Sequence, residues 1–116
     1  MADKVAVISF SAETLRQVRQ RRPSIRTALL IGEKAEPGPE ALAGTTREAA
    51  ADHPDMHWEL ATPEVVDAFH AAGMPVWVWT VNDEGIMRRL LDLGVDGVTT
   101  DRPSALQKVL QQGIVE

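Results

Sequence analysis

Three histidines are the residues best suited to acid–base or metal chemistry, because the sequence contains no cysteine. His53 and His57 are four residues apart, a spacing that would place both imidazoles on one face of a helix. Pro54 stands between them and argues against one continuous helix, so a zinc-binding pair is not expected. His70 lies inside a helical pattern and is expected at the solvent edge. Without cysteine there is no disulfide, no thiolate metal ligand and no thiol nucleophile.

Motifs that carry a complete reactive site are missing from the sequence. It has no G-x-x-x-x-G-K-[ST] phosphate loop, no G-x-G-x-x-G dinucleotide motif and no G-x-S-x-G nucleophile turn. Any chemistry therefore depends on residues that the fold brings together from separate segments.

The chain alternates short apolar runs with amphipathic helical stretches. Strands are expected at residues 5–10, 27–31, 56–60, 75–81 and 95–100. Helices are expected at residues 12–21, 63–72, 84–93 and 103–112, with a Gly- and Pro-rich loop at 33–44 and a weak helix at 46–52. The repeated β–α order predicts an α/β domain over residues 1–116, with parallel strands and right-handed crossovers.

In parallel βα folds, functional residues lie at the carboxyl ends of the strands. Here those ends carry hydroxyls, carboxylates, an amide and an indole. The segments are Ser9-Phe10-Ser11, Ile31-Gly32-Glu33, Trp58-Glu59-Leu60, Thr80-Val81-Asn82-Asp83 and Thr99-Thr100-Asp101-Arg102. They contain no obvious set of metal ligands and no nucleophile–base pair, so no catalytic or metal-binding residue is expected in this chain.

Three segments resemble motifs of the glycerophosphodiester phosphodiesterase family. They are VISF at residues 7–10, VWVWTVND at 76–83 and LDLGVDGVTTDRP at 91–103. The order and spacing of these segments are similar to those of the fourth, seventh and eighth strands of that family's eight-stranded barrel. The resemblance implies the C-terminal part of a TIM (βα)8 barrel, strands four to eight, with residues 32–55 only weakly matched.

The resemblance implies a phosphoric diester hydrolase of lipid metabolism. Members of the family cleave glycerophosphodiesters to glycerol 3-phosphate and an alcohol, using Ca²⁺ or Mg²⁺ and two histidines as general acid and base. In the family, an H-R-G turn and an E-x-D pair in the first three strands contribute to this machinery. Neither motif occurs here, so we expect this chain alone to bind no cofactor and to be inactive.

The same resemblance assigns residues to the wall of a substrate pocket. Trp79 is similar to the family indole that packs on the glycerol of the substrate. Asn82 would cap the following helix and reach the pocket mouth, while Ser9 and Phe10 would border the floor. Asp101 is expected to cap the last helix. A purely structural role is the alternative for each: Trp79 as core, Asn82 as a cap.

Five strands are too few to close a barrel, which takes about 250 residues. The open edges would expose unpaired backbone and apolar surface. We therefore expect a homo-oligomer or association with a missing N-terminal half, and the structural alternative is an open, flavodoxin-like five-stranded sheet. The functional alternative to part of an enzyme is a non-catalytic half-barrel that acts as an oligomerising or binding module.

The charge of the chain limits its partners. A net charge of −5 and a pI near 5.1 argue against nucleic acids and anionic membranes. The basic cluster at residues 19–22 is expected at the C-terminal end of a helix, where cations are favoured. The sequence contains no apolar run of about 18 residues and no signal-peptide pattern, so we expect a cytoplasmic protein without a membrane span.

Overall fold

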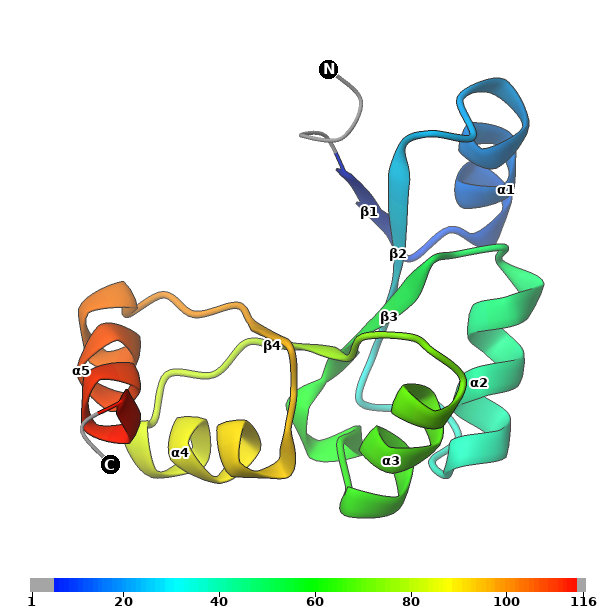
Figure 1. Cartoon of the computed structure of the whole chain (residues 1–116). Coiled ribbons are helices and arrows are strands. Elements are labelled where there is room, and N and C mark those ends of the chain that lie inside the picture. Colours follow the sequence, from blue (N-terminus) through cyan, green and yellow to red (C-terminus); the bar gives the residue numbers. More distant parts are fainter. Residues whose placement is uncertain (1–5, 115–116) are drawn as a thin grey trace.

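The computed structural model describes residues 6–114, in which strands and helices alternate along the chain (Figure 1). The strands are β1 (Ala6–Ser9), β2 (Arg26–Ile31), β3 (His53–His57), β4 (Trp77–Trp79) and β5 (Gly97–Val98). The helices are α1 (Ala12–Arg21), α2 (Pro39–Glu48), the 3₁₀ turn η2 (Trp58–Leu60), α3 (Pro63–Ala71), α4 (Glu84–Leu93) and α5 (Pro103–Ile114). None of the helices in this part of the chain is long and apolar enough to cross a bilayer.

The strands form one parallel sheet in the order β1-β2-β3-β4-β5. Each strand therefore pairs with the next one along the sequence, as in a βα barrel. A flavodoxin-like sheet instead places its first strand between the second and third. The predicted α/β fold of barrel type is confirmed, and the flavodoxin-like alternative is wrong.

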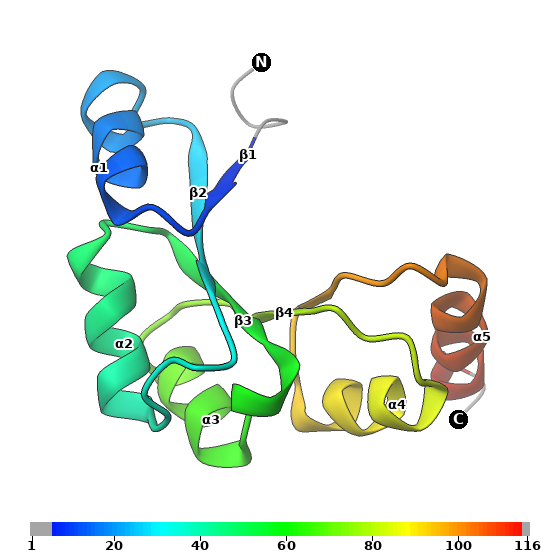
Figure 2. The same ribbon diagram turned by 180° about the vertical axis from the view of Figure 1, so that it is seen from behind.

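Figures 1 and 2 show the helices arranged in an arc along one side of the curved sheet, with the opposite side open between β1 and α5. The radius of gyration of the Cα atoms is 14.4 Å. A compact domain of this length would have roughly 13 Å. The difference is in the direction expected for a sheet that curves but does not close.

The hydrophobic core fills the space between the sheet and the helices. Because side chains alternate along a strand, one set points to the helices. This set includes Leu29, Ile31, Met56 and Val78, and the helices contribute Leu15, Leu42, Val66, Phe69, Met87 and Leu90. Burying each such side chain stabilises the fold by roughly 1.5–3 kcal/mol. The core lies on the convex side of the sheet, beneath the helices.

Side-chain caps define where three helices begin. The hydroxyl of Ser11 accepts a hydrogen bond from the Thr14 amide at the start of α1. The Asp83 carboxylate accepts one from Ile86 at the start of α4, so the prediction that Asn82 caps this helix is wrong. The hydroxyl of Thr62 accepts a hydrogen bond from the Val65 amide at the start of α3.

Helix α2 corrects the predicted loop at 33–44 and weak helix at 46–52. It begins at Pro39, whose fixed φ suits the first helical position, after Gly38 with a φ of 108°. Leu42 and Thr46 are buried beneath it. Tertiary burial thus outweighs the unfavourable helix propensity of Gly44, which is about 1 kcal/mol.

Strand β3 begins three residues before the predicted strand at 56–60, and residues 58–60 form η2 instead. Pro54 lacks an amide hydrogen and is therefore unusual inside a sheet. It lies where β3 pairs with β2 alone, because β4 joins only from Asp55 onward. The missing amide hydrogen of Pro54 therefore removes no hydrogen bond between β3 and β4.

Strands β4 and β5 are shorter than predicted, but backbone hydrogen bonds extend their pairing. The Asp96 amide donates to the Val76 carbonyl at 2.8 Å, and the Val81 amide donates to the Thr99 carbonyl at 2.9 Å. Gly94, with a φ of 95°, ends α4 in the left-handed conformation that favours glycine. The turn from α4 into β5 is therefore where the sequence predicts it.

Candidate substrate pocket

Polar side chains of β3 face the concave side of the sheet. Alternation sends His53, Asp55 and His57 to this side together, opposite the helices. In the register of the sheet, Trp77 lies beside Asp55 and Trp79 beside His57. The open side of the curved sheet therefore carries a row of three titratable groups next to two indoles.

A pocket of about 340 Å³ opens on this concave face. Its lining is Ile8, Phe10, Leu30, Asp55, Trp79, Thr80 and Thr99. Phe10, Thr80 and Thr99 each come directly after the last residue of a strand. The pocket therefore lies at the carboxyl ends of the strands, where βα barrels place their ligands.

Two aromatic rings form one corner of this concave pocket. Phe10 and Trp79 pack edge to face, with centroids 6.1 Å apart and planes at 89°. The indole nitrogen of Trp79 donates to the carbonyl oxygen of Asp55 at 2.9 Å, which fixes the ring on β3. Phe10 is 64% exposed, so its ring is available to a ligand or a partner chain.

Asp55 is the most unusual polar group of the concave face. The residue is 2% exposed, and its Oδ1 has no hydrogen-bond partner among the described residues. Burial disfavours the charged carboxylate and raises the pKa of Asp55 to about 6. A buried acid with an unused acceptor is energetically costly unless a ligand or partner supplies a donor.

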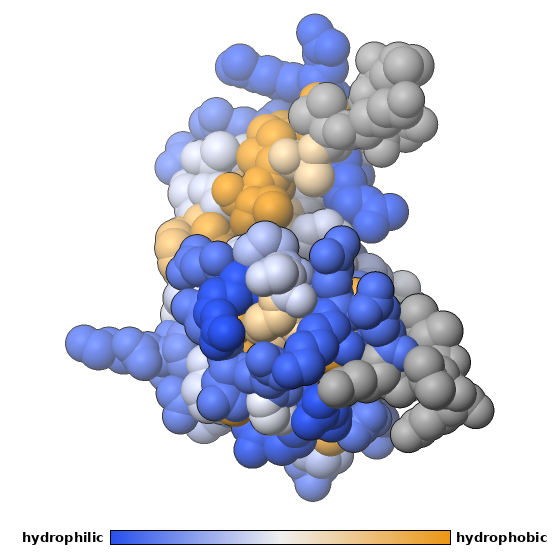
Figure 3. Space-filling model, turned by 90° about the vertical axis from the view of Figure 1, so that its left-hand side faces the viewer, coloured by the Kyte–Doolittle hydropathy of each residue, from blue (hydrophilic) through white to orange (hydrophobic). Residues whose placement is uncertain are grey.

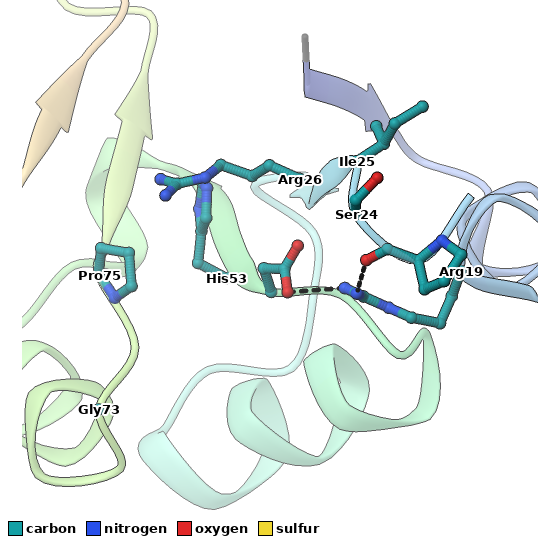
Figure 4. Close-up of a pocket in the computed structure, with 9 residues that line it drawn as sticks. Arg19, Ser24, Ile25, Arg26, His53, Gly73 and Pro75 are labelled. Carbon is teal, nitrogen blue, oxygen red and sulfur yellow. Dashed lines mark hydrogen bonds and ion pairs between the residues drawn. The ribbon is translucent and has the colours of Figure 1, made fainter. Parts of the chain in front are cut away.

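His53 occupies the other end of β3, above a second cavity of about 380 Å³ at the amino ends of the strands. Its Nδ1 lies 3.0 Å from the Pro54 carbonyl, and Nε2 is buried without a described partner. Burial lowers the pKa of His53; the hydrogen bond to the Pro54 carbonyl opposes this shift, and the nearby charge of Arg26 adds to it. Figure 4 shows Arg26 reaching toward this imidazole. Burial therefore disfavours the protonated form of His53.

The basic cluster at residues 19–22 lies at the end of α1, as predicted. Arg19 forms an ion pair with Asp52 at 2.6 Å and also donates to the Pro23 carbonyl (Figure 4). Asp52 accepts the amide of Thr27. Arg19 therefore ties α1 to the beginnings of β2 and β3, which is a structural role.

His57 lies between two exposed carboxylates at the carboxyl end of β3. Its Nε2 is 3.9 Å from Glu33 and its Nδ1 is 3.9 Å from Glu59. The ring packs against Trp58 and Trp79. Among the described residues, Glu33, His57 and Glu59 are the set that could approach a metal ion together.

Asn82 organises the loop at the ends of β4 and β5. Its side-chain oxygen accepts from the Thr100 hydroxyl at 3.2 Å and from the Asp101 amide at 2.9 Å. Its amide group donates to the Asp101 carboxylate at 3.3 Å. Because Arg102 immediately precedes α5, the expected cap at Asp101 is wrong, and that carboxylate serves Asn82 instead.

His70 has a partner that the sequence did not indicate. Its Nε2 lies 2.7 Å from Asp96, and both side chains are about two-fifths exposed. Burial alone would raise the pKa of Asp96, but hydrogen bonds from the Val76 amide and His70 outweigh it and lower that pKa. This pair joins α3 to the turn before β5, away from the concave pocket.

The sequence profile of the "Glycerophosphoryl diester phosphodiesterase family" matches residues 1–105. The chain belongs to this family. It is 31% identical over 112 residues to the glycerophosphodiester phosphodiesterase of Caldanaerobacter subterraneus, covering 96% of this chain and 44% of that protein. It is 35% identical over 108 residues to that of Bacillus subtilis, covering 91% and 36%.

A solved structure agrees with this assignment. The chain is similar to a glycerophosphodiester phosphodiesterase from Parabacteroides distasonis with a TM-score of 0.81 and 28% identity, over 97% of this chain and 45% of that one. The chain therefore spans less than half the length of these family members.

The metal ion that the family implies is a poor fit to Glu33, His57 and Glu59. The Glu59 amide donates to Nδ1 of His57, so the neutral ring carries its proton on Nε2, which faces Glu33. A cation bound at Nε2 would need the opposite tautomer. Ca²⁺ and Mg²⁺ also prefer oxygen ligands, and both glutamates are more than 60% exposed. That no metal ligand lies in this chain stays a prediction.

Two of the four residues assigned to the pocket by the family resemblance come together. Phe10 and Trp79 line it, whereas Ser9 and Asn82 do not. Ser9 points to the opposite face of β1, where its hydroxyl accepts the Ser11 amide. The sequence analysis missed Asp55, although the alternation of H-P-D-M-H around it is the signal of a strand with a polar face.

Proposed function

We propose that this chain is the C-terminal half of a glycerophosphodiester phosphodiesterase barrel. The completed barrel would hydrolyse glycerophosphodiesters to glycerol 3-phosphate and an alcohol, in the cytoplasm. The observation that carries the proposal is the concave pocket at the carboxyl ends of the strands, where Phe10 and Trp79 meet. Family membership supports the reaction class, and the position of this pocket at the carboxyl ends of the strands supports substrate binding there.

In this proposal, Trp79 and Phe10 pack against the glycerol of the substrate. Asn82 holds the rim through Thr100 and Asp101, and Ser9 supports the chain next to Phe10. The divalent cation and the acid–base histidines would come from the completing half. The cation would polarise the phosphodiester and offset its charge.

Exposed apolar surface supports a partner for the concave face. Ile8 on β1, an edge strand of the sheet, is 41% exposed, and Phe10, directly after β1, is 64% exposed. Figure 3 shows a continuous hydrophobic patch on the open side of the molecule. Edge strands with apolar side chains are prone to pair with further strands. We propose that a second copy or a missing N-terminal half covers this surface.

A hydrolysis assay tests the enzymatic proposal. The purified chain is incubated with glycerophosphocholine and Ca²⁺ or Mg²⁺, with and without a chelator. We expect no turnover above background, because the chain lacks the H-R-G and E-x-D motifs. Chelator-sensitive activity of the isolated chain would refute the half-enzyme proposal.

The second candidate function is a non-catalytic half-barrel that acts as an oligomerising or binding module, which the exposed surface of β1 favours. Two observations separate the candidates. A reading frame directly upstream that encodes H-R-G and E-x-D supports the half-enzyme. A stable assembly of two or more 12.7 kDa chains by light scattering, without such a frame, supports the module.

A further inference from the structure

The floor of the concave pocket carries an acid that the family resemblance does not use. Asp55 is 2% exposed, and Oδ1 accepts no hydrogen bond from the described residues. We propose that this pocket binds the primary ammonium group of a small organic amine, with the Asp55 carboxylate as its acceptor. The proposal uses the same pocket as the proposed substrate site, but amine binding would require neither a metal ion nor a completed barrel.

Charge favours a cationic ligand at this position. The other charged or titratable side chains of the concave strands are Arg26 on β2 and His53 and His57 on β3, and none of them forms a described bond with Asp55. Burial raises the pKa of Asp55 to about 6, so the carboxylate is still ionised at pH 8. An incoming ammonium would give this carboxylate the opposite charge that it lacks.

The walls of the pocket suit an ammonium with a short carbon chain. Phe10 and Trp79 present perpendicular rings, and a cation over an aromatic face is favoured by the ring's electrons. Ile8 and Leu30 supply apolar contact for methylene groups. Besides Asp55, the polar residues of this lining are Thr80 and Thr99, and the other four lining residues are apolar.

The unused oxygen distinguishes a primary amine from a quaternary one. Oδ1 of Asp55 lacks a hydrogen-bond donor among the described residues. An –NH₃⁺ group brings three N–H donors, whereas a trimethylammonium brings the same charge and none. Ethanolammonium and choline therefore form a matched pair of probes that separate hydrogen bonding from charge.

The experiment titrates the 116-residue chain at pH 8 with ethanolammonium chloride, choline chloride or ethanol at constant ionic strength. The indole N–H of Trp79 is the reporter, because it donates to the carbonyl of Asp55. Its assigned ¹H–¹⁵N NMR signal should shift saturably with ethanolammonium. Choline should bind several-fold more weakly, and ethanol should cause no saturable shift.

Two variants complete the test. Asp55→Asn keeps the shape and removes the charge, so it should weaken ethanolammonium binding roughly tenfold to hundredfold, as expected for a charged hydrogen bond. Asp92→Asn, an exposed residue of α4, should bind like the parent chain. The proposal is overturned if the parent chain shows no saturable shift, if Asp55→Asn binds equally well, or if choline matches ethanolammonium.

Discussion

Replacing Asp55 with asparagine should stabilise the protein at neutral and alkaline pH. The folded state raises the pKa of Asp55 from 3.8 to about 6. At about 1.36 kcal/mol per pH unit, ionising this acid costs the folded state about 3 kcal/mol. That is a large share of the roughly 5–15 kcal/mol that stabilises a typical domain.

The sign follows from proton binding. Between pH 4 and 6 the folded chain binds more protons at Asp55 than the unfolded chain, so this residue's contribution to stability falls as pH rises and levels off above pH 6. The carboxamide of the Asp55→Asn variant cannot ionise. The variant should therefore gain about 3 kcal/mol over the parent at pH 8, and less than about 1 kcal/mol at pH 4.

The assay is urea unfolding followed by tryptophan fluorescence, at several pH values from 4 to 8. The difference between the parent and Asp55→Asn cancels the titration of the other carboxylates. Asp92→Asn, at an exposed site of α4, serves as the control and should change the free energy of unfolding little at any pH. A variant less stable than the parent at pH 8, or a difference independent of pH, would refute the reasoning.

Two further predictions concern other contacts. Gly97→Ala should lower the free energy of unfolding by about 1–3 kcal/mol, because a Cβ there would lie 2.9 Å from the ring of Trp77. Thermal or urea unfolding measures this change. Gly44→Ala is the control: the space around Gly44 is open, so this variant should be neutral or stabilising. Asp96→Asn should cost about 1–2 kcal/mol at pH 7 through the Val76 amide and His70. Because folding lowers the pKa of Asp96, this loss of stability should shrink as the pH falls below the usual pKa of an aspartate. A loss that stays the same at low pH would count against the ion pair.

Helices with local signals were predictable from the sequence. Ser11, Thr62 and Gly94 mark helix ends, and α1, α3 and α4 lie within a residue or so of their expected ranges. Helix α2 was not predictable in this way. Its helical state depends on burying Leu42 and Thr46, which is a tertiary effect that local propensity does not contain.

The aromatic lining of the candidate pocket was predictable only where the family resemblance reached. Trp79 and Phe10 belong to matched motifs, and they meet in the pocket. Asp55 lies in the weakly matched segment, in a strand whose inward positions are polar. The alternation around Asp55 indicates a strand with a polar face, but the burial of that face depends on the fold, so the raised pKa of Asp55 cannot be predicted from the sequence pattern.

The side chains that cover the concave face of the sheet limit what the proposed partner could contact. Trp77 packs on Gly97 and on the ring of His53, while Trp79 is fixed on the backbone of Asp55. These indoles already cover the middle of β3 within this chain. A partner would therefore bury little apolar surface there. It would bury most at Ile8, on the edge strand β1, and at Phe10, directly after it. Assembly and ligand binding consequently share Ile8 and Phe10, whereas Asp55 and Trp79 serve ligand binding.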